Sequence, residues 1–154
     1  MKNLIQLLIP VFALSILPSC SDVQSQSDIK ALPPSPTPSP EGSKVYIISP
    51  KNGATVSKTF TVQFGLKGMG VAPAGVFVEG KSTGHHHIVL DAETPNLKLP
   101  FPMNENYLHY GGGQTETELT LKPGRHTLQL VVGDHNHFPH QPPLVSDTIT
   151  ITVQ

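Results

Sequence analysis

The sequence predicts an all-β domain built from two packed antiparallel sheets. Between residues 44 and 154, short runs of alternating apolar and polar residues are separated by glycine, proline and asparagine, the pattern of half-buried strands joined by turns. No stretch of useful length in this region has the 3.6-residue apolar periodicity of a helix. About seven short strands at this spacing are typical of an immunoglobulin-like β-sandwich, and we expect that fold here.

Six of the expected strands can be placed by their apolar alternation. They span residues 44–49, 59–65, 85–91, 115–121, 125–134 and 147–153. Successive side chains in a strand point to opposite faces, so the core-facing residues recur at every second position. Outside the strand 85–91, the expected inward residues are Val45, Ile47, Phe60, Val62, Phe64, Leu119, Leu121, Leu128, Leu130, Val132, Ile149, Ile151 and Val153.

The turn Lys-Pro-Gly at residues 122–124 fixes how two of these strands are connected, and His126 directly follows it. Immunoglobulin-like sandwiches commonly carry a tyrosine at this corner, which hydrogen-bonds back to the backbone a few residues upstream. His126 occupies that place and is in phase with Leu128 and Leu130. We therefore interpret His126 as a structural residue and not as a ligand.

Residues 1–19 have the layout of a secretion signal. Lys2 precedes an apolar run from Leu4 to Leu17, which is too short for a durable membrane span. The run ends in Leu-Pro-Ser-Cys, which resembles the bacterial lipobox, so we expect Cys20 to be the first mature residue and to carry lipid. The alternative is an ordinary cleaved signal and a free thiol. Ser21 favours the outer membrane over the inner one in a Gram-negative cell, with the domain facing the periplasm.

Residues 20–43 are expected to form a disordered tether between this lipid anchor and the domain at residues 44–154. The segment has no periodic apolar pattern, and five prolines fall between Pro33 and Pro40. Such a composition cannot bury enough apolar surface to offset the entropy lost on ordering the chain. A domain attached to a membrane through Cys20 would need a spacer of this kind.

Composition excludes several classes of function. The formal net charge is −1 and no run of lysine or arginine is present, so nucleic acid is not an expected partner. Cys20 is the only cysteine. The domain therefore has no disulfide, and a blue-copper centre, a cysteine-ligated zinc site and a thiol nucleophile are all excluded from it.

Seven of the eight histidines are expected at one end of the sandwich. Three open the strand 85–91, one lies just before the strand 115–121, and three follow the strand 125–134. In this connectivity those three places lie at the same pole. Neutral imidazole is the commonest metal ligand near neutral pH, and copper and zinc sites take three or four such groups. We therefore predict a copper or zinc site whose candidate ligands are His85, His86, His87, His109, His137 and His140.

The sequence leaves open which of the three consecutive histidines reaches the ion. Because neighbouring strand residues face opposite ways, all three cannot easily serve one site. His86 shares a face with Ile88 and Leu90, whereas His85 and His87 face the other way. The alternative for all three is a polar cluster at a strand edge that is simply solvated or hydrogen-bonded.

Three other residues are weaker candidates. His135 follows the Gly-Asp pair that ends its strand, so it is the most dispensable histidine of its loop. Met69 and Met103 are soft donors suited to Cu(I), although packing in the core or a loop is the commoner role of methionine.

Four segments of the domain carry a family resemblance. They are GMGVAPAG, GHHHIVLD, HYGGGQTETELTLKPGRHTLQLVVGD and NHFPHQPP. Together they resemble a bacterial domain family of unknown function, whose members are secreted or lipid-anchored single domains. The resemblance covers roughly residues 44–154. It implies a small β-sandwich in the cell envelope and supplies no activity.

The function predicted from the sequence is metal storage, delivery or tolerance in the cell envelope, with a metal-handling protein as a candidate partner. One alternative is a structural or adhesive envelope module that binds no metal, since fold alone does not settle function. Another is a metal-dependent enzyme at the same site, with Glu116 or Asp134 as general base. No nucleophile or convincing acid–base pair is present in the sequence, so we expect a protein that is not an enzyme.

Overall fold

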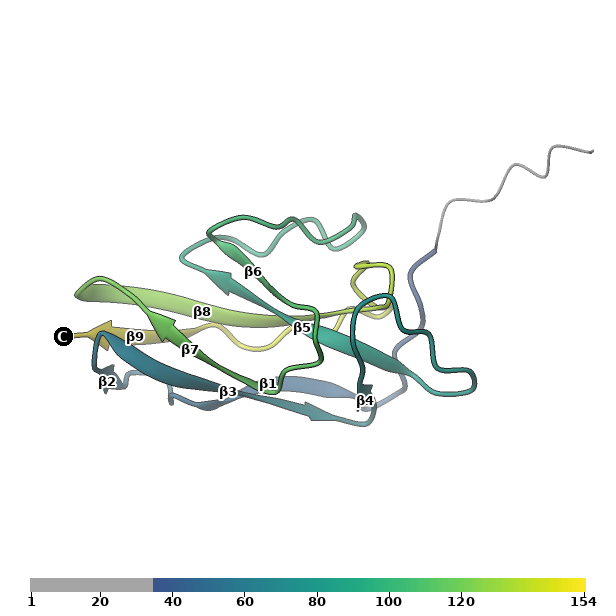
Figure 1. Ribbon diagram of the computed structural model, residues 1–154, viewed down its shortest axis with the longest axis horizontal. Helices are drawn as coiled ribbons and strands as arrows, with labels where there is room; N and C mark the ends of the chain where they lie inside the picture. Colours follow the sequence, from purple (N-terminus) through teal and green to yellow (C-terminus); the bar gives the residue numbers. More distant parts are fainter. Residues whose placement is uncertain (1–34) are drawn as a thin grey trace, which may run out of the picture. The chain divides into compact units, whose positions relative to one another are not determined.

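The computed structural model describes residues 35–154 and contains nine strands in that part of the chain (Figure 1). Cys20, the expected signal and the first part of the expected tether lie outside the described residues. The strands are β1 (Lys44–Ser49), β2 (Thr55–Val56), β3 (Thr59–Lys67), β4 (Gly70–Val71), β5 (Thr83–Leu90), β6 (Tyr107–Tyr110), β7 (Glu116–Thr120), β8 (Gly124–Gly133) and β9 (Ile149–Val153).

These strands form two sheets that pack face to face. One sheet has the order β1-β3-β7, and the other has the order β2-β9-β8-β5-β4 with β6 paired to β5. All pairings are antiparallel except β2 with β9 and β4 with β5. Figure 1 shows β5, β8 and β9 in one layer and β1, β3 and β7 in the other. The predicted immunoglobulin-like β-sandwich is confirmed, and β2 and β4 are short additions of two residues each.

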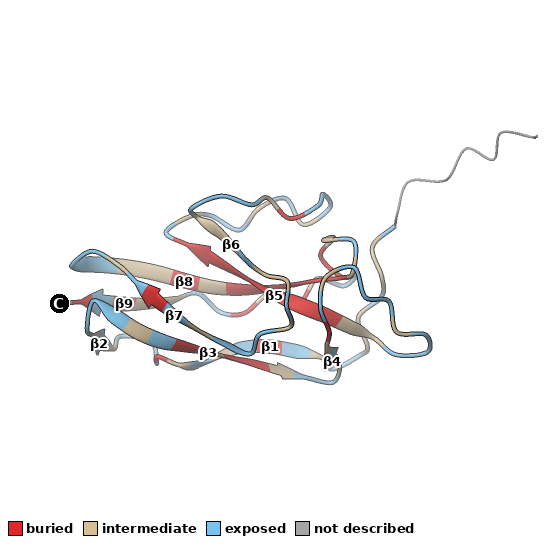
Figure 2. Ribbon diagram, viewed as in Figure 1, coloured by how far each residue is buried: buried red, intermediate tan, exposed pale blue. Residues whose placement is uncertain are grey.

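The core lies between the sheets and follows the predicted alternation. The facing side chains of β3, β8 and β9 are buried together, and Val62, Leu128, Leu130, Val132 and Ile151 have no exposed surface (Figure 2). Burying each such side chain contributes about 1.5–3 kcal/mol. This core, and not a disulfide, holds the domain together. Residues 35–154 belong to one compact unit that contains all of it.

Strand β5 differs from its neighbours because both of its faces are buried. From Gly84 to Leu90, every residue of β5 is buried. One face contributes Ile88 to the core between the sheets. On the other face, Val89 packs with Phe101 and Val131 in a smaller apolar cluster. The chain between β5 and β6 thus covers the outer face of the sheet, and this cover makes buried space for side chains that would otherwise face water.

His126 makes the contact expected of the corner residue. Its Nε2 lies 2.8 Å from the carbonyl oxygen of Lys122, four residues upstream. Its Nδ1 lies 2.6 Å from Oδ2 of Asp91, whose other carboxylate oxygen accepts the backbone N–H of Thr127. His126 therefore ties the end of β5 to the start of β8, which supports its interpretation as a structural residue.

The domain begins earlier in the chain than the predicted boundary at residue 44. Pro38 forms a parallel bridge with Gln141, and the backbone of Thr37 and Ser39 hydrogen-bonds to Gln141 on either side of it. Backbone groups make these bonds, so side-chain composition gave no sign of them. Within residues 35–154, no helix is long and apolar enough to cross a membrane.

Candidate metal centre

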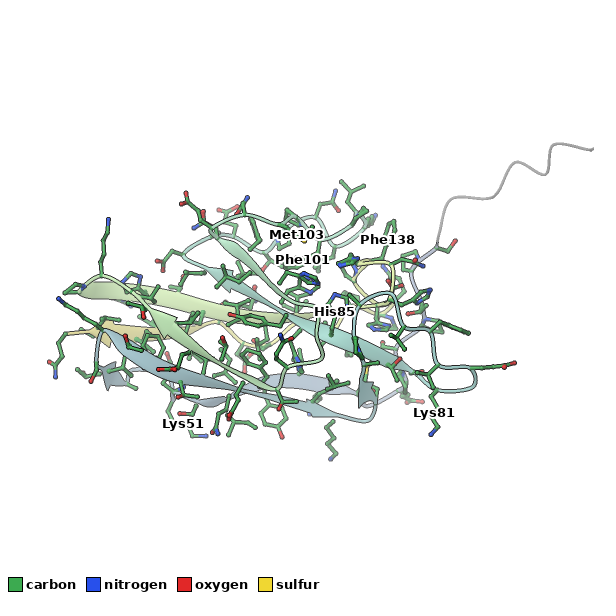
Figure 3. All side chains as sticks on the ribbon, viewed as in Figure 1. Lys51, Lys81, His85, Phe101, Met103 and Phe138 are labelled. Atoms are coloured by element: carbon green, nitrogen blue, oxygen red, sulfur yellow. The ribbon has the colours of Figure 1, made fainter. Side chains whose placement is uncertain are left out.

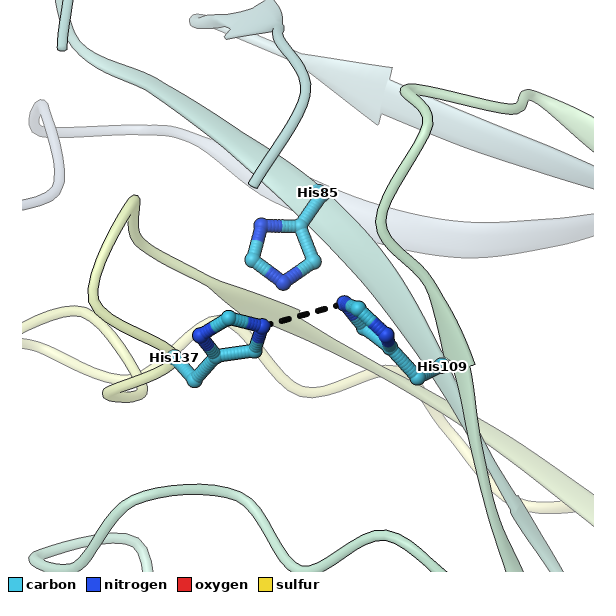
Figure 4. A group of neighbouring side chains, drawn as sticks. All are labelled: His85, His109 and His137. Carbon is cyan, nitrogen blue, oxygen red and sulfur yellow. Dashed lines mark hydrogen bonds between the residues drawn. The ribbon is translucent and has the colours of Figure 1, made fainter. Parts of the chain in front are cut away.

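Three histidines from three separate elements meet on the outer face of the larger sheet. His85 comes from β5, His109 from β6, and His137 from the loop that follows β8 (Figure 4). One ring nitrogen of each lies within 4.8 Å of the others. The Nε2 atoms of His109 and His137 are 3.2 Å apart. Three imidazole donors so placed could hold one metal ion, and all three residues are among the predicted ligands.

Strand register explains how the first two of these side chains meet. His87 pairs with His109 across β5 and β6, and His85 pairs with Gly133 across β5 and β8. Side chains at alternate positions share a face, so His85 and His87 point to the same side as the cross-strand partner His109. Of the two faces that the sequence left open, the one that carries His85 and His87 therefore lies beside His109. In Figure 3, His85, Phe101 and Met103 lie on this side of the sheet, away from Lys51.

Two glycines make room for the imidazole rings. A Cβ atom at Gly133 would lie 2.7 Å from Cε1 of His87 and 3.6 Å from Nε2 of His85. A Cβ atom at Gly111 would overlap the ring of His109. Real Cβ atoms essentially never approach another atom within 3.0 Å, so the rings of His87 and His109 lie directly against backbone that only glycine leaves free. The glycine-rich segment after β6 therefore shapes the site directly.

The ring nitrogens of His85 and His87 are buried without a hydrogen-bond partner. Both side chains have no exposed surface. None of their four ring nitrogens has a hydrogen-bond partner among residues 35–154. Each buried polar group left in this way costs about 1–3 kcal/mol. His86 and His140 each have one such nitrogen, Nε2, so within the described residues His85 and His87 are the histidines in which both ring nitrogens are buried without a partner.

The electrostatic environment keeps these imidazoles neutral, which is the form that binds a metal. Burial, followed by the nearby His137 and His109, lowers the pKa of His85 to about 4. Burial, followed by His85 and His109, lowers the pKa of His87 to about 2. The pKa of His109 is also lowered, first by burial and then by His137. At neutral pH these groups therefore carry no charge and have a lone pair available.

His87 adjoins the group of three donors without belonging to it. Its ring is 4.7 Å from that of His85 and stacks on that of His109 at 5.2 Å, but the ring of His137 is 6.3 Å away. Its other neighbour is Phe101, whose ring centroid is 4.1 Å away. His87 thus forms the buried inner wall of the site, and the exposed His109 forms its outer edge.

The structure separates two of the predicted ligands from this group. His86 lies on the core face of β5, where its ring is 5.1 Å from that of Phe64 and its Nδ1 lies 3.2 Å from the carbonyl oxygen of Gln114. His140 is fully buried, and its Nε2 would lie 2.8 Å from a Cβ at Gly84, which shares a face with His86. Both are therefore on the opposite side of the sheet from His85, because the strand alternates.

The remaining histidine and the two methionines also lie outside the donor group. The ring of His135 is 5.2 Å from that of Phe77. Met69 packs against the main core, and Met103 is exposed.

The two candidate general bases have other contacts. Glu116 lies on β7 in the smaller sheet, where it accepts a hydrogen bond from Gln63. The carboxylate of Asp134 is fully buried and accepts backbone N–H bonds from Thr37, Asn136 and Phe138.

Sequence reasoning missed β6. The sequence places His109 just before the strand 115–121 without a strand of its own, yet His109 lies in a four-residue strand beside β5. The short alternation of Leu108 and Tyr110, directly before three glycines, was the only signal of that strand. Because β6 pairs with β5, backbone hydrogen bonds between the two strands position His109.

Comparison with known proteins identifies a family. No curated protein was found to be similar to the chain. An endo-beta-1,4-mannanase from Thermotoga petrophila is 15% identical, with a TM-score of 0.43, over 73% of this chain and 20% of that one. Fibronectin(III)-like modules of CbhA from Clostridium thermocellum are 12% identical, with a TM-score of 0.37, over 72% of this chain and 45% of that one. This chain spans less than half of either.

The family assignment rests on the sequence of the domain itself. A family model matches residues 62–154, which include β5, β6, β8 and all eight histidines. That range is more than half of the chain, and it confirms the predicted membership in a family of unknown function. The chain therefore belongs to the family described as Domain of unknown function (DUF4399).

Proposed function

We propose that the domain binds one transition-metal ion through His85, His109 and His137. The observation that carries this proposal is the convergence of three imidazole donors within 4.8 Å, from two strands and a loop. Both ring nitrogens of His85 are buried and have no hydrogen-bond partner in residues 35–154. A bound ion would satisfy one of them and offset part of the cost of burying it.

The spacing of two of the three donors is compatible with a first-row ion. Two nitrogens bound to zinc at 2.0–2.1 Å in a tetrahedral arrangement are about 3.3 Å apart, close to the 3.2 Å between the Nε2 atoms of His109 and His137. Because the donor set holds nitrogen and no thiolate, it suits Cu(II) or Zn(II). Affinity for such a site rises to copper in the divalent series, so copper is favoured where both ions are available.

The accessible edge of the site favours a protein that exchanges its metal. His85 is buried, His137 is partly buried and His109 is exposed. An ion held by these three would therefore be reached from the side of His109, where a further ligand from solvent or from a partner can bind. We propose that the protein stores, delivers or detoxifies copper or zinc in the cell envelope, with a metal-handling protein as its partner. Lipid on Cys20 would hold it at the membrane, facing the periplasm.

Calorimetric titration of residues 33–154 with Cu(II) and with Zn(II) tests the proposal. We expect one ion per domain with a sub-micromolar Kd, and loss of binding in the double variant His109→Ala/His137→Ala. His135→Ala is the matched control, since His135 lies in the same loop as His137 but outside the donor group. Weak binding that the double variant retains would refute a metal site in this place.

A further inference from the structure

Asp134 organises the loop that carries His137. Its side chain is fully buried, and its Oδ1 accepts the backbone N–H groups of Asn136 and Phe138 at 2.9 and 3.0 Å. Its own backbone carbonyl accepts the N–H of His137 at 2.9 Å. The loop is thus closed around one side chain, whose oxygen accepts two backbone N–H groups.

His137 needs such a closed loop. Its φ is 65°, in the left-handed region that residues other than glycine seldom adopt. A residue keeps this conformation only where its surroundings impose it. The carbonyl of His137 accepts the N–H of Phe101 at 2.8 Å, which fixes the loop from the outer side. The position of this metal donor therefore depends on what holds residues 134–141.

Residues 37–39, nearly a hundred residues earlier in the chain, make some of the hydrogen bonds that hold this loop. The N–H of Thr37 donates to Oδ2 of Asp134 at 3.0 Å, and its hydroxyl lies 2.9 Å from Nδ1 of the buried His140. The backbone of Gln141 donates to the carbonyl of Thr37 and accepts from the N–H of Ser39, both at 3.0 Å. Figure 1 shows this blue segment running beside the loop between β8 and β9.

We propose that residues 37–39 form a strap, a segment that packs against residues 134–141 and so positions the metal centre. Thr37 is its main positioning residue. The strap supplies the only hydrogen bond that Oδ2 of Asp134 receives within the described residues. It also holds His140, a buried histidine that the donor group does not use. The segment that joins the domain to its predicted anchor is therefore part of the site, and metal affinity depends on its docking. This inference rests on the proposed metal binding and adds a second element that controls it.

Substitutions at Thr37 separate the two kinds of contact. Thr37→Pro removes the N–H that Asp134 accepts, together with the hydroxyl, whereas Thr37→Val removes the hydroxyl alone. We expect Thr37→Pro to weaken Zn(II) binding by residues 33–154 about tenfold, the factor that one hydrogen bond to a charged group supports. Thr37→Val should have a smaller effect. Ser35→Pro is the control, because it places a proline in the same segment two residues before the strap.

Zn(II) affinity is measured by competition with a chromophoric chelator. A Thr37→Pro variant that folds and binds Zn(II) like the wild type would overturn the strap while leaving the proposed function intact. Failure of the wild type to bind would instead overturn the proposed function. These two failures are therefore distinguishable.

Hydrogen exchange on the wild-type domain gives a second test that needs no substitution. Coupling between two sites is reciprocal, so bound Zn(II) must tighten the strap if the strap tightens the site. We expect saturating Zn(II) to slow exchange at the amides of Thr37, Ser39 and Gln141. The amide of Gly53, which bonds to Thr150 in the distant β2–β9 region, should not change. Unchanged exchange at the strap in the metal-bound protein would also overturn the inference.

Discussion

The Nε2 atoms of His109 and His137 lie 3.2 Å apart, although 28 residues separate them in the chain. Two neutral imidazoles at this distance either share one proton in a hydrogen bond or bind the same ion. With His85 beside them, the second arrangement would also give a partner to one of its buried ring nitrogens. The contact joins β6 to the loop after β8, so the distance between the two rings depends on how each of these elements is held in place.

Substitutions within β5 should separate its two faces. We expect His85→Ala to abolish metal binding, because it removes a buried donor. His86→Leu should retain one bound ion per domain, since His86 packs on Phe64 on the core side of the strand. Titration calorimetry with Zn(II) on both variants measures this difference. If His86→Leu folds but no longer binds the metal, the metal ligand of β5 lies on its core face and the prediction is wrong.

Gly133→Ala should lower both the stability of the domain and its affinity for metal. The new methyl group would lie 2.7 Å from the ring of His87, so the ring or the strand must shift. Overpacking of this kind costs about 1–3 kcal/mol of unfolding free energy, and we expect weaker metal binding as well. Gly70→Ala is the control, because its Cβ would approach nothing closer than a methyl group of Thr83, at 3.3 Å. Urea denaturation of both variants checks the prediction, which fails if Gly133→Ala is as stable as the control.

The metal-free domain should lose stability as the solution is acidified below neutral pH. The pKa of His85 is about 4 in the folded domain and 6.5 as its ordinary value, so between these pH values the unfolded chain binds more protons. Stability therefore falls with falling pH, and His85 accounts for about 3 kcal/mol of the loss between pH 7 and pH 4.

His85→Leu provides the comparison, because it removes the titrating group at similar volume. Its unfolding free energy, measured in urea with a chelator present, should fall less steeply from pH 7 to pH 4 than that of the wild type. Parallel curves for the two proteins would contradict the lowered pKa of His85.

The corner histidine should show the opposite sign. The hydrogen bond to Asp91, followed by the one to Lys122, raises the pKa of His126. Its contribution to stability is therefore complete below the ordinary pKa of 6.5 and is lost as pH rises through the raised folded value. In an NMR titration, Asp91→Asn should lower the pKa of His126, whereas Asp147→Asn should leave it unchanged. An unchanged pKa in Asp91→Asn would exclude the carboxylate as the cause.

Much of the sandwich could be predicted because its signals are local. Alternation in segments such as 59–65 and 125–134 shows which side chains share a face, and the Lys-Pro-Gly turn orients two strands and His126. The convergence of histidines on one pole followed from that connectivity. Strand β6 was not predicted, since four residues of alternation are too few to identify a strand without its partner β5.

Alternation along a strand places His85 and His87 on one face and His86 on the other whatever surrounds the strand, so this division could be predicted from the sequence. Which of the two faces lies beside the other histidines depends on contacts in the folded domain. Phe101 covers the outer face of β5, β6 brings His109 beside it, and Thr37 hydrogen-bonds to Asp134 in the loop of His137. These contacts join segments far apart in the chain. They are stabilised by packing and backbone pairing between distant segments, which cannot be predicted from a local pattern of residues.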